Sequence, residues 1–151
     1  MARVDPKLLS PIKHRGESSQ AHLALLRSRD VLVGARTKLV NHVRGAVKSF
    51  GGRLPKCTAE TFHKRRSPRA LARGTHISPG ADPGDHSASL TERIKYYDCK
   101  LEDVAEELYP ETKLLRQIHG VGVLTALAFV LTLEDPSRFA KSREVGAYLG
   151  L

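Results

Sequence analysis

The run Ile118-His119-Gly120-Val121-Gly122 has the clearest chemical purpose in the sequence, because it places two glycines between two apolar segments. Gly120 and Gly122 let the backbone turn tightly and keep side chains from standing between it and a phosphate group. The N–H groups at the start of the helix that follows point outward and favour an anion. The residues predicted to contact phosphate here are Lys113, Arg116, Gly120, Val121, Gly122, Leu124 and Thr125.

A glycine turn of this kind between two helices resembles the helix-hairpin-helix DNA-binding motif. Residues 111–117 are expected to form the first, short helix, and Val121 is expected to plug the turn into the core. Such contacts hold phosphate and do not read base sequence. The alternative is a plain connection between two helices that uses glycine for its geometry alone.

The chain carries its positive charge unevenly. It has 151 residues and a formal net charge of +9, but residues 1–79 hold 17 Lys and Arg against 4 Asp and Glu, whereas residues 80–151 hold 8 against 12. A basic first half predicts a polyanion-binding surface, and a solvated basic face without a partner is the alternative. The candidate contacts with a nucleic-acid backbone are Arg29, Arg36, Arg44, Lys48, Lys64, Arg65 and Arg66.

Two long helices are expected to position these residues. Residues 17–52 read as a basic helix, ended by Gly51 and Gly52, whose apolar residues recur at the spacing of a helix–helix seam. That seam consists of Leu25, Leu32, Leu39, Val43, Ala46 and Phe50. Residues 89–109 read as an acidic helix that starts with the capping box Ser89-Leu90-Thr91-Glu92. Its seam consists of Leu90, Ile94, Tyr97, Leu101, Val104 and Leu108.

The predicted fold is therefore all-α. We expect the two long helices to pair as an antiparallel coiled-coil hairpin, followed over residues 110–151 by a partial helix-hairpin-helix domain. Residues 1–16 read as an irregular lead-in, and residues 53–88, with four prolines, as a disordered basic connector that cannot be helical over 75–86. Near the C-terminus we expect a turn at 134–136 and a last helix over 143–149, capped by Ser142.

Other chemistries find little support. Cys57 and Cys99 do not make a disulfide framework. With His63, His76 and His86, these cysteines also lack the close pairs of a structural zinc site, so no metal is predicted. The sequence has no apolar run long enough to cross a membrane and no secretory signal, which makes the cytoplasm the expected compartment.

Three stretches of the chain resemble the DEDD transposases of the insertion-sequence 110/116/902 family. The first includes Asn41-His42-Val43-Arg44-Gly45 and the second Leu90-Thr91-Glu92-Arg93-Ile94. The third, which is the most specific, contains Gln117-Ile118-His119-Gly120-Val121-Gly122 and runs to Leu151. Together they cover about two-thirds of the chain.

The resemblance implies a longer enzyme. Such transposases have a ribonuclease-H-like domain with four acidic ligands for a divalent metal such as Mg²⁺, then a coiled coil, then a second catalytic domain with a nucleophilic serine. The acids would precede Met1 and the serine would follow Leu151, so no residue present inherits a catalytic role. Asp5 does not stand in for an acid of the quartet, and residues 1–16 would be the tail of the missing domain.

The expected function is that of a transposase fragment that binds nucleic acid and is inactive alone. The resemblance implies DNA as a partner, together with a guide RNA from the insertion element and a second copy through the coiled coil. The alternative is a complete small helical protein for DNA binding or dimerisation.

Overall fold

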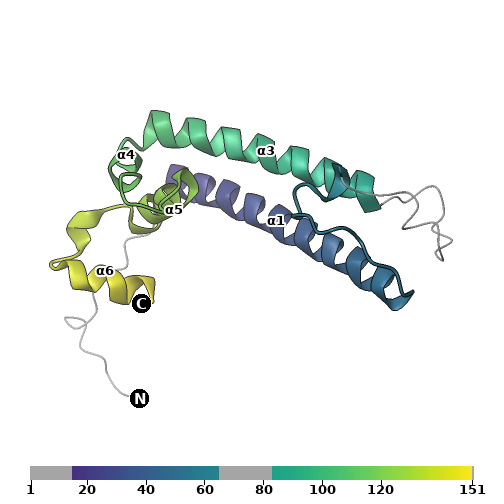
Figure 1. Cartoon of the computed structure of the whole chain (residues 1–151). Helices are drawn as coiled ribbons and strands as arrows, with labels where there is room; N and C mark the ends of the chain where they lie inside the picture. The colour runs from purple at the N-terminus through teal and green to yellow at the C-terminus, as the bar shows by residue number, and fades with distance from the viewer. Residues whose placement is uncertain (1–14, 65–82, 151) are drawn as a thin grey trace, which may run out of the picture.

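The computed structural model describes residues 15–64 and 83–150, and these residues are all-α, as predicted. Within them there is no β-strand. Two long helices form the body of the molecule, and the C-terminal elements pack at one end of it (Figure 1). The elements are α1 (Glu17–Ser49), η2 (Phe62–Lys64), α3 (Pro83–Leu108), α4 (Thr112–Leu115), α5 (Val123–Leu133), η3 (Pro136–Arg138) and α6 (Ser142–Leu149).

Helices α1 and α3 lie side by side and run in opposite directions (Figure 1). Arg29 Nε lies 2.9 Å from Asp98 Oδ1, and Arg36 Nη1 donates to Thr91 Oγ1 at 3.2 Å. The partner's residue number falls as the number on α1 rises, which is the register of an antiparallel pair. The two long helices thus pair in antiparallel orientation, while the coiled-coil character of the pair stays a prediction.

The seam of α1 lies one residue later than predicted. The buried residues of α1 are Ser19, Leu23, Leu26, Val40, Val43 and Val47. Of the predicted seam only Val43 is buried; Leu25, Leu32, Leu39 and Ala46 lie half-buried at its edge, and Phe50 is 62% exposed. The reason is that Arg29 and Arg36 face α3 and find polar partners there, which apolar spacing alone does not reveal.

The buried residues of α3 also differ from the apolar seam that the sequence predicts. Its buried residues are Ser87, Thr91, Ile94, Leu101 and Ala105. Ile94 and Leu101 were predicted, whereas Leu108 is 56% exposed. The small side chains of Ser87, Thr91 and Ala105 let the helices approach closely, and Thr91 accepts a hydrogen bond from Arg36.

Helix α3 also begins earlier than predicted. Its first residue is Pro83, so the prediction that 75–86 cannot be helical is wrong from residue 83, and Ser89 and Glu92 lie inside the helix instead of capping it. Proline fits the first turn of a helix because the N–H it lacks would have no helical partner there. Residues 65–82, including Arg65 and Arg66, lie outside the described residues.

Residues 53–64, predicted as part of a disordered connector, pack against α1. Phe62 is 3% exposed and joins Val40, Val43 and Val47 in a second apolar cluster. The aromatic ring of Phe62 supplies the apolar surface that the low Ile and Val content of this segment hides.

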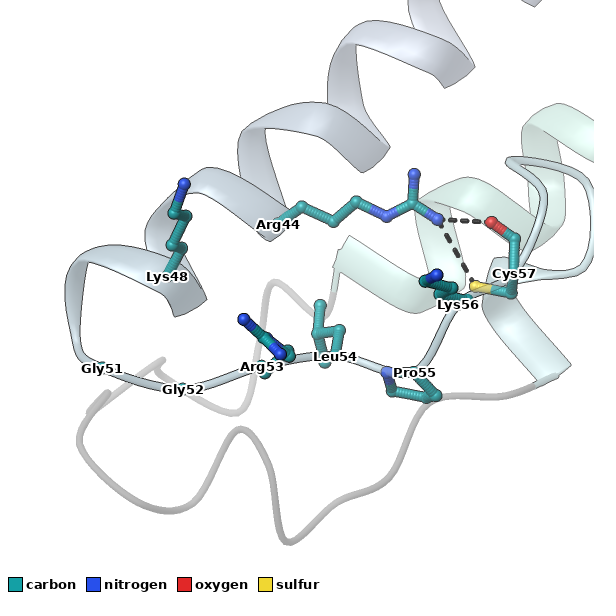
Figure 2. A pocket seen from close by; sticks show the side chains of 9 residues that line it. All are labelled: Arg44, Lys48, Gly51, Gly52, Arg53, Leu54, Pro55, Lys56 and Cys57. Atoms are coloured by element: carbon teal, nitrogen blue, oxygen red, sulfur yellow. Dashed lines mark hydrogen bonds between the residues drawn. The ribbon is translucent and has the colours of Figure 1, made fainter.

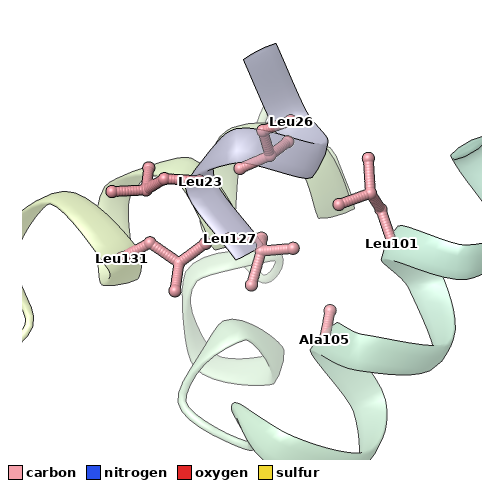
Figure 3. Close-up of a cluster of buried hydrophobic side chains, with 6 residues drawn as sticks. All are labelled: Leu23, Leu26, Leu101, Ala105, Leu127 and Leu131. Carbon is pink, nitrogen blue, oxygen red and sulfur yellow. The ribbon is translucent and has the colours of Figure 1, made fainter. Parts of the chain in front are cut away.

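Helix α5 closes the molecule by packing between the start of α1 and the end of α3 (Figure 3). The cluster that joins the three helices consists of Leu23, Leu26, Leu101, Ala105, Leu127 and Leu131. The predicted cap of the last helix is wrong, because Lys141 precedes α6 and Ser142 is its first residue. Among the described residues, no side chain caps this helix, but Glu144 Oε2 accepts a hydrogen bond from the Ala140 N–H at 2.9 Å, just before the helix begins.

The predicted glycine stop of α1 is confirmed and can be tested. Gly51 has φ +75°, where a side chain costs about 1–2 kcal/mol. Gly51→Ala is expected to lower the free energy of unfolding by about 1 kcal/mol, measured by urea denaturation. Gly45 lies inside α1 with open space around its Cα, so the control Gly45→Ala should stabilise by about 0.5–1 kcal/mol. Equal effects would contradict the left-handed stop.

Candidate nucleic-acid interface

The connection between α4 and α5 forms the tight glycine turn that the sequence predicts. The first helix is shorter than expected, since α4 is one turn long. After α4, the N–H groups of Gln117 and Ile118 donate to the carbonyls of Leu114 and Leu115, at 3.2 and 3.1 Å, so turns with bonds between residues three apart follow the helix. Gly120 then reverses the chain with φ +88°, a value that favours glycine.

Gly122 precedes the first turn of α5 in an extended conformation and makes no side-chain cap. Its carbonyl accepts from the Ala126 N–H at 2.9 Å, which starts the helical ladder. The N–H groups of Val123, Leu124 and Thr125 precede that first bond, so they have no acceptor within the helix. A Cβ atom added at Gly120 or Gly122 would meet no atom within 4 Å. The backbone here is therefore open to an approaching anion.

Two partly buried hydrogen bonds hold the segment before this turn against the helix pair. The Thr112 side chain is buried, and its Oγ1 donates to the Tyr109 carbonyl at 2.7 Å. The hydroxyl of Tyr109 lies 2.9 Å from Nδ1 of His22 on α1, and the two rings meet edge to face. These contacts fix the end of α3 and the start of α4 relative to α1.

The predicted phosphate contacts divide into exposed and packed residues. Lys113, Arg116 and Thr125 are exposed on the same short segment as the two open glycines. The plug expected from Val121 comes instead from Val123 and Leu124, which pack against the apolar cluster. The side chain of Leu124 is therefore part of the packing, which leaves only its backbone N–H as a candidate contact.

Three of the arginines proposed to contact nucleic acid are engaged within the hairpin. Arg29 pairs with Asp98, and Arg36 donates to Thr91. Arg44 donates to the Cys57 carbonyl and lies over the Phe62 ring, 5.9 Å from its centre. Lys48 and Lys64 are exposed. Part of the positive charge expected to face nucleic acid along α1 therefore bonds other residues of the chain.

Sequence reasoning missed Arg53 and Lys56. Both follow the glycine stop of α1, where the chain turns back and brings them to the same pocket as Arg44 and Lys48. Their spacing carries no helical or strand period, so only the conformation of Gly51 and Gly52 brings the four together.

The described residues do not fit the divalent metal that the resemblance implies. Among residues 15–64 and 83–150, no three His, Cys, Asp or Glu side chains lie where they could hold one ion. None of the helices described is both long and apolar enough to span a bilayer.

The region that contains the glycine turn is similar to a known protein family. Residues 112–151 match the model of the transposase IS116/IS110/IS902 family. This part of the chain is therefore similar to that family. The match begins at the first residue of α4 and takes in the turn, α5 and α6.

Named transposases of insertion sequences are similar along most of the chain. The transposase for insertion sequence element IS1111A of Coxiella burnetii is 29% identical over 85% of this chain and 36% of its own length. The transposase for IS1328 of Yersinia enterocolitica is 30% identical over 91% and 41%. A putative transposase of Sinorhizobium fredii, y4pF/y4sB, is 31% identical over 87% and 34%. The chain thus spans about a third to two-fifths of these relatives. No solved structure matches it.

Proposed function

We propose that this chain is a nucleic-acid-binding segment of an insertion-sequence transposase, and that it holds the phosphate backbone of DNA at the turn between α4 and α5. The observation that carries the proposal is the pair of open glycines, Gly120 and Gly122, directly before the free N–H groups of α5. The match of this same region to a transposase family favours DNA over other polyanions.

The arrangement would work by charge and backbone geometry. Phosphate oxygens accept hydrogen bonds from the first N–H groups of α5, where the helix dipole adds positive potential. Lys113 and Arg116 are exposed beside the turn and supply full positive charges. Because these groups touch only phosphate, binding should be nearly independent of base sequence. A guide RNA of the insertion element would present the same phosphates.

We further propose that the chain does not cleave nucleic acid by itself. Two-metal strand cleavage needs acidic side chains that converge from different elements. The exposed carboxylates Glu102, Asp103, Glu106 and Glu107 instead follow one helix, α3, and no metal-holding cluster occurs among the described residues. The segment would therefore position nucleic acid for chemistry performed elsewhere.

The double variant Lys113→Ala/Arg116→Ala tests the flanking charges. We expect it to bind a labelled DNA duplex about tenfold more weakly near physiological salt, with a salt slope lowered by about 2, because two phosphate contacts are lost. The loss should be equal for two duplexes of unrelated sequence, measured by fluorescence anisotropy.

The matched control removes one arginine and one lysine from α3, as Arg93→Ala/Lys95→Ala. Both side chains are exposed, so the change in net charge is identical while the turn is untouched. An equal loss of affinity in the control would show that overall charge, and not the turn, binds the duplex.

A further inference from the structure

A basic pocket lies at the end of α1, where the chain turns back along the hairpin (Figure 2). It is open to solvent, has a volume of about 610 Å³ and is lined by Arg44, Lys48, Gly51, Gly52, Arg53, Leu54, Pro55, Lys56 and Cys57. Four of these nine residues are cationic and none is acidic. Such a concentration of one charge around a cavity favours an anionic ligand.

Three of the four cations are free to meet a ligand. Lys48, Arg53 and Lys56 are exposed, and within the described part of the chain none of them forms an ion pair. Arg44 is fixed from within, because one of its terminal nitrogens donates to the Cys57 carbonyl (Figure 2). The pocket therefore combines one anchored guanidinium with three adaptable cations.

The glycine turn shapes this pocket and supplies hydrogen-bond donors to the carbonyl groups at the end of α1. The carbonyl groups at a helix C-terminus ordinarily repel an anion. Here the N–H groups of Phe50, Gly51 and Gly52 donate to carbonyls of the last turn, at 3.3, 3.0 and 2.9 Å. A Cβ at Gly52 would lie 2.8 Å from Val47 Cγ1, so the backbone passes closely beneath the helix end.

An exposed aromatic ring stands next to the pocket in the chain. Phe50 is 62% exposed directly before Gly51, and it takes part in none of the ring contacts found among the described residues. Proteins that bind single-stranded nucleic acid combine a cationic groove for the backbone with aromatic rings on which bases stack. Both components occur together at the end of α1.

We infer that this end of the hairpin binds an unpaired nucleic-acid strand, with its phosphates in the basic pocket and a base stacked on Phe50. A duplex fits less well, because its bases are already stacked and its phosphates lie on a convex surface. Helix α1 has 33 residues, or about 50 Å at 1.5 Å per residue, and the turn before α5 lies at its other end. The pocket is thus a second site that does not rest on the function proposed above.

The test measures the binding of a labelled oligothymidylate of about 20 nucleotides, which stays single-stranded, to the whole chain. Lys48→Ala/Arg53→Ala/Lys56→Ala is expected to weaken binding at least about tenfold and to lower the salt slope by about 2. Phe50→Ala should weaken it about fivefold or more, whereas Phe50→Tyr should bind like the original chain. The control Arg93→Ala/Lys95→Ala/Lys100→Ala removes the same charges from exposed positions on α3 and should change affinity less than about twofold.

Three outcomes would overturn the inference. An equal loss in the control would mean that overall positive charge binds the strand. An unchanged affinity of Phe50→Ala would show that no base stacks on Phe50. Binding of inorganic pyrophosphate that the triple variant abolishes, with oligothymidylate binding unchanged, would identify a small-anion site. Circular dichroism should show unchanged helix content in every variant. Loss of duplex binding in Lys113→Ala/Arg116→Ala with strand binding intact would separate the two sites.

Discussion

Replacing Leu127 with alanine is expected to lower the free energy of unfolding by about 2–5 kcal/mol. Leu127 is completely buried where α5 meets both long helices, against Leu23 and Leu101 among others. The change removes apolar contact and leaves a cavity in the cluster that joins all three helices. Helix α5 has 11 residues, and a helix this short is marginal without tertiary packing. Urea denaturation followed by circular dichroism measures the loss.

A surface leucine provides the matched control for this prediction. Leu114 is 68% exposed on α4, so Leu114→Ala should change the free energy of unfolding by no more than about 0.5 kcal/mol. If both variants lost the same stability, α5 would not be seated between α1 and α3 as described.

Gly122→Val is expected to weaken duplex binding about 100-fold while leaving the fold intact. Gly122 has φ −84°, which any residue adopts, and an added Cβ meets no atom within 4 Å. The valine side chain would instead occupy the space through which a phosphate reaches the N–H groups of α5. Losing two hydrogen bonds to a charged phosphate costs about 3 kcal/mol, which corresponds to about 100-fold in affinity.

The control for this variant is Gly34→Val, since Gly34 lies in the middle of α1 and likewise has open space around it. It should bind the duplex within about twofold of the original chain, because no phosphate contact is placed there. Retained duplex affinity in Gly122→Val, together with normal helix content, would remove the turn from the mechanism.

Local rules predicted the elements of this fold better than their packing. The glycine stop of α1, the turn at 134–136 and the helix that follows Gly122 each depend on a few neighbouring residues, and the structure shows all three. Which residues of α1 and α3 face each other depends on the side chains of both helices. Arg29 and Arg36 enter the seam because Asp98 and Thr91 receive them, and neither pairing is visible from one helix alone.

The glycine turn and the basic pocket also differ in how far the sequence predicts them. The turn at Gly120 and Gly122 is a continuous stretch of sequence, so its geometry follows from residue type and spacing. The basic pocket is assembled from the end of α1 and the segment that returns past it. Arg53 and Lys56 therefore became candidates only once the path of the chain after Gly51 was known.

The most direct test of the central claim is the affinity of the whole chain for a labelled DNA duplex across a series of salt concentrations. Backbone binding at the α4–α5 turn predicts that log affinity falls steeply and linearly with log salt. It also predicts the same slope for duplexes of unrelated sequence and a smaller slope for Lys113→Ala/Arg116→Ala. An affinity that does not change with salt would contradict the claim.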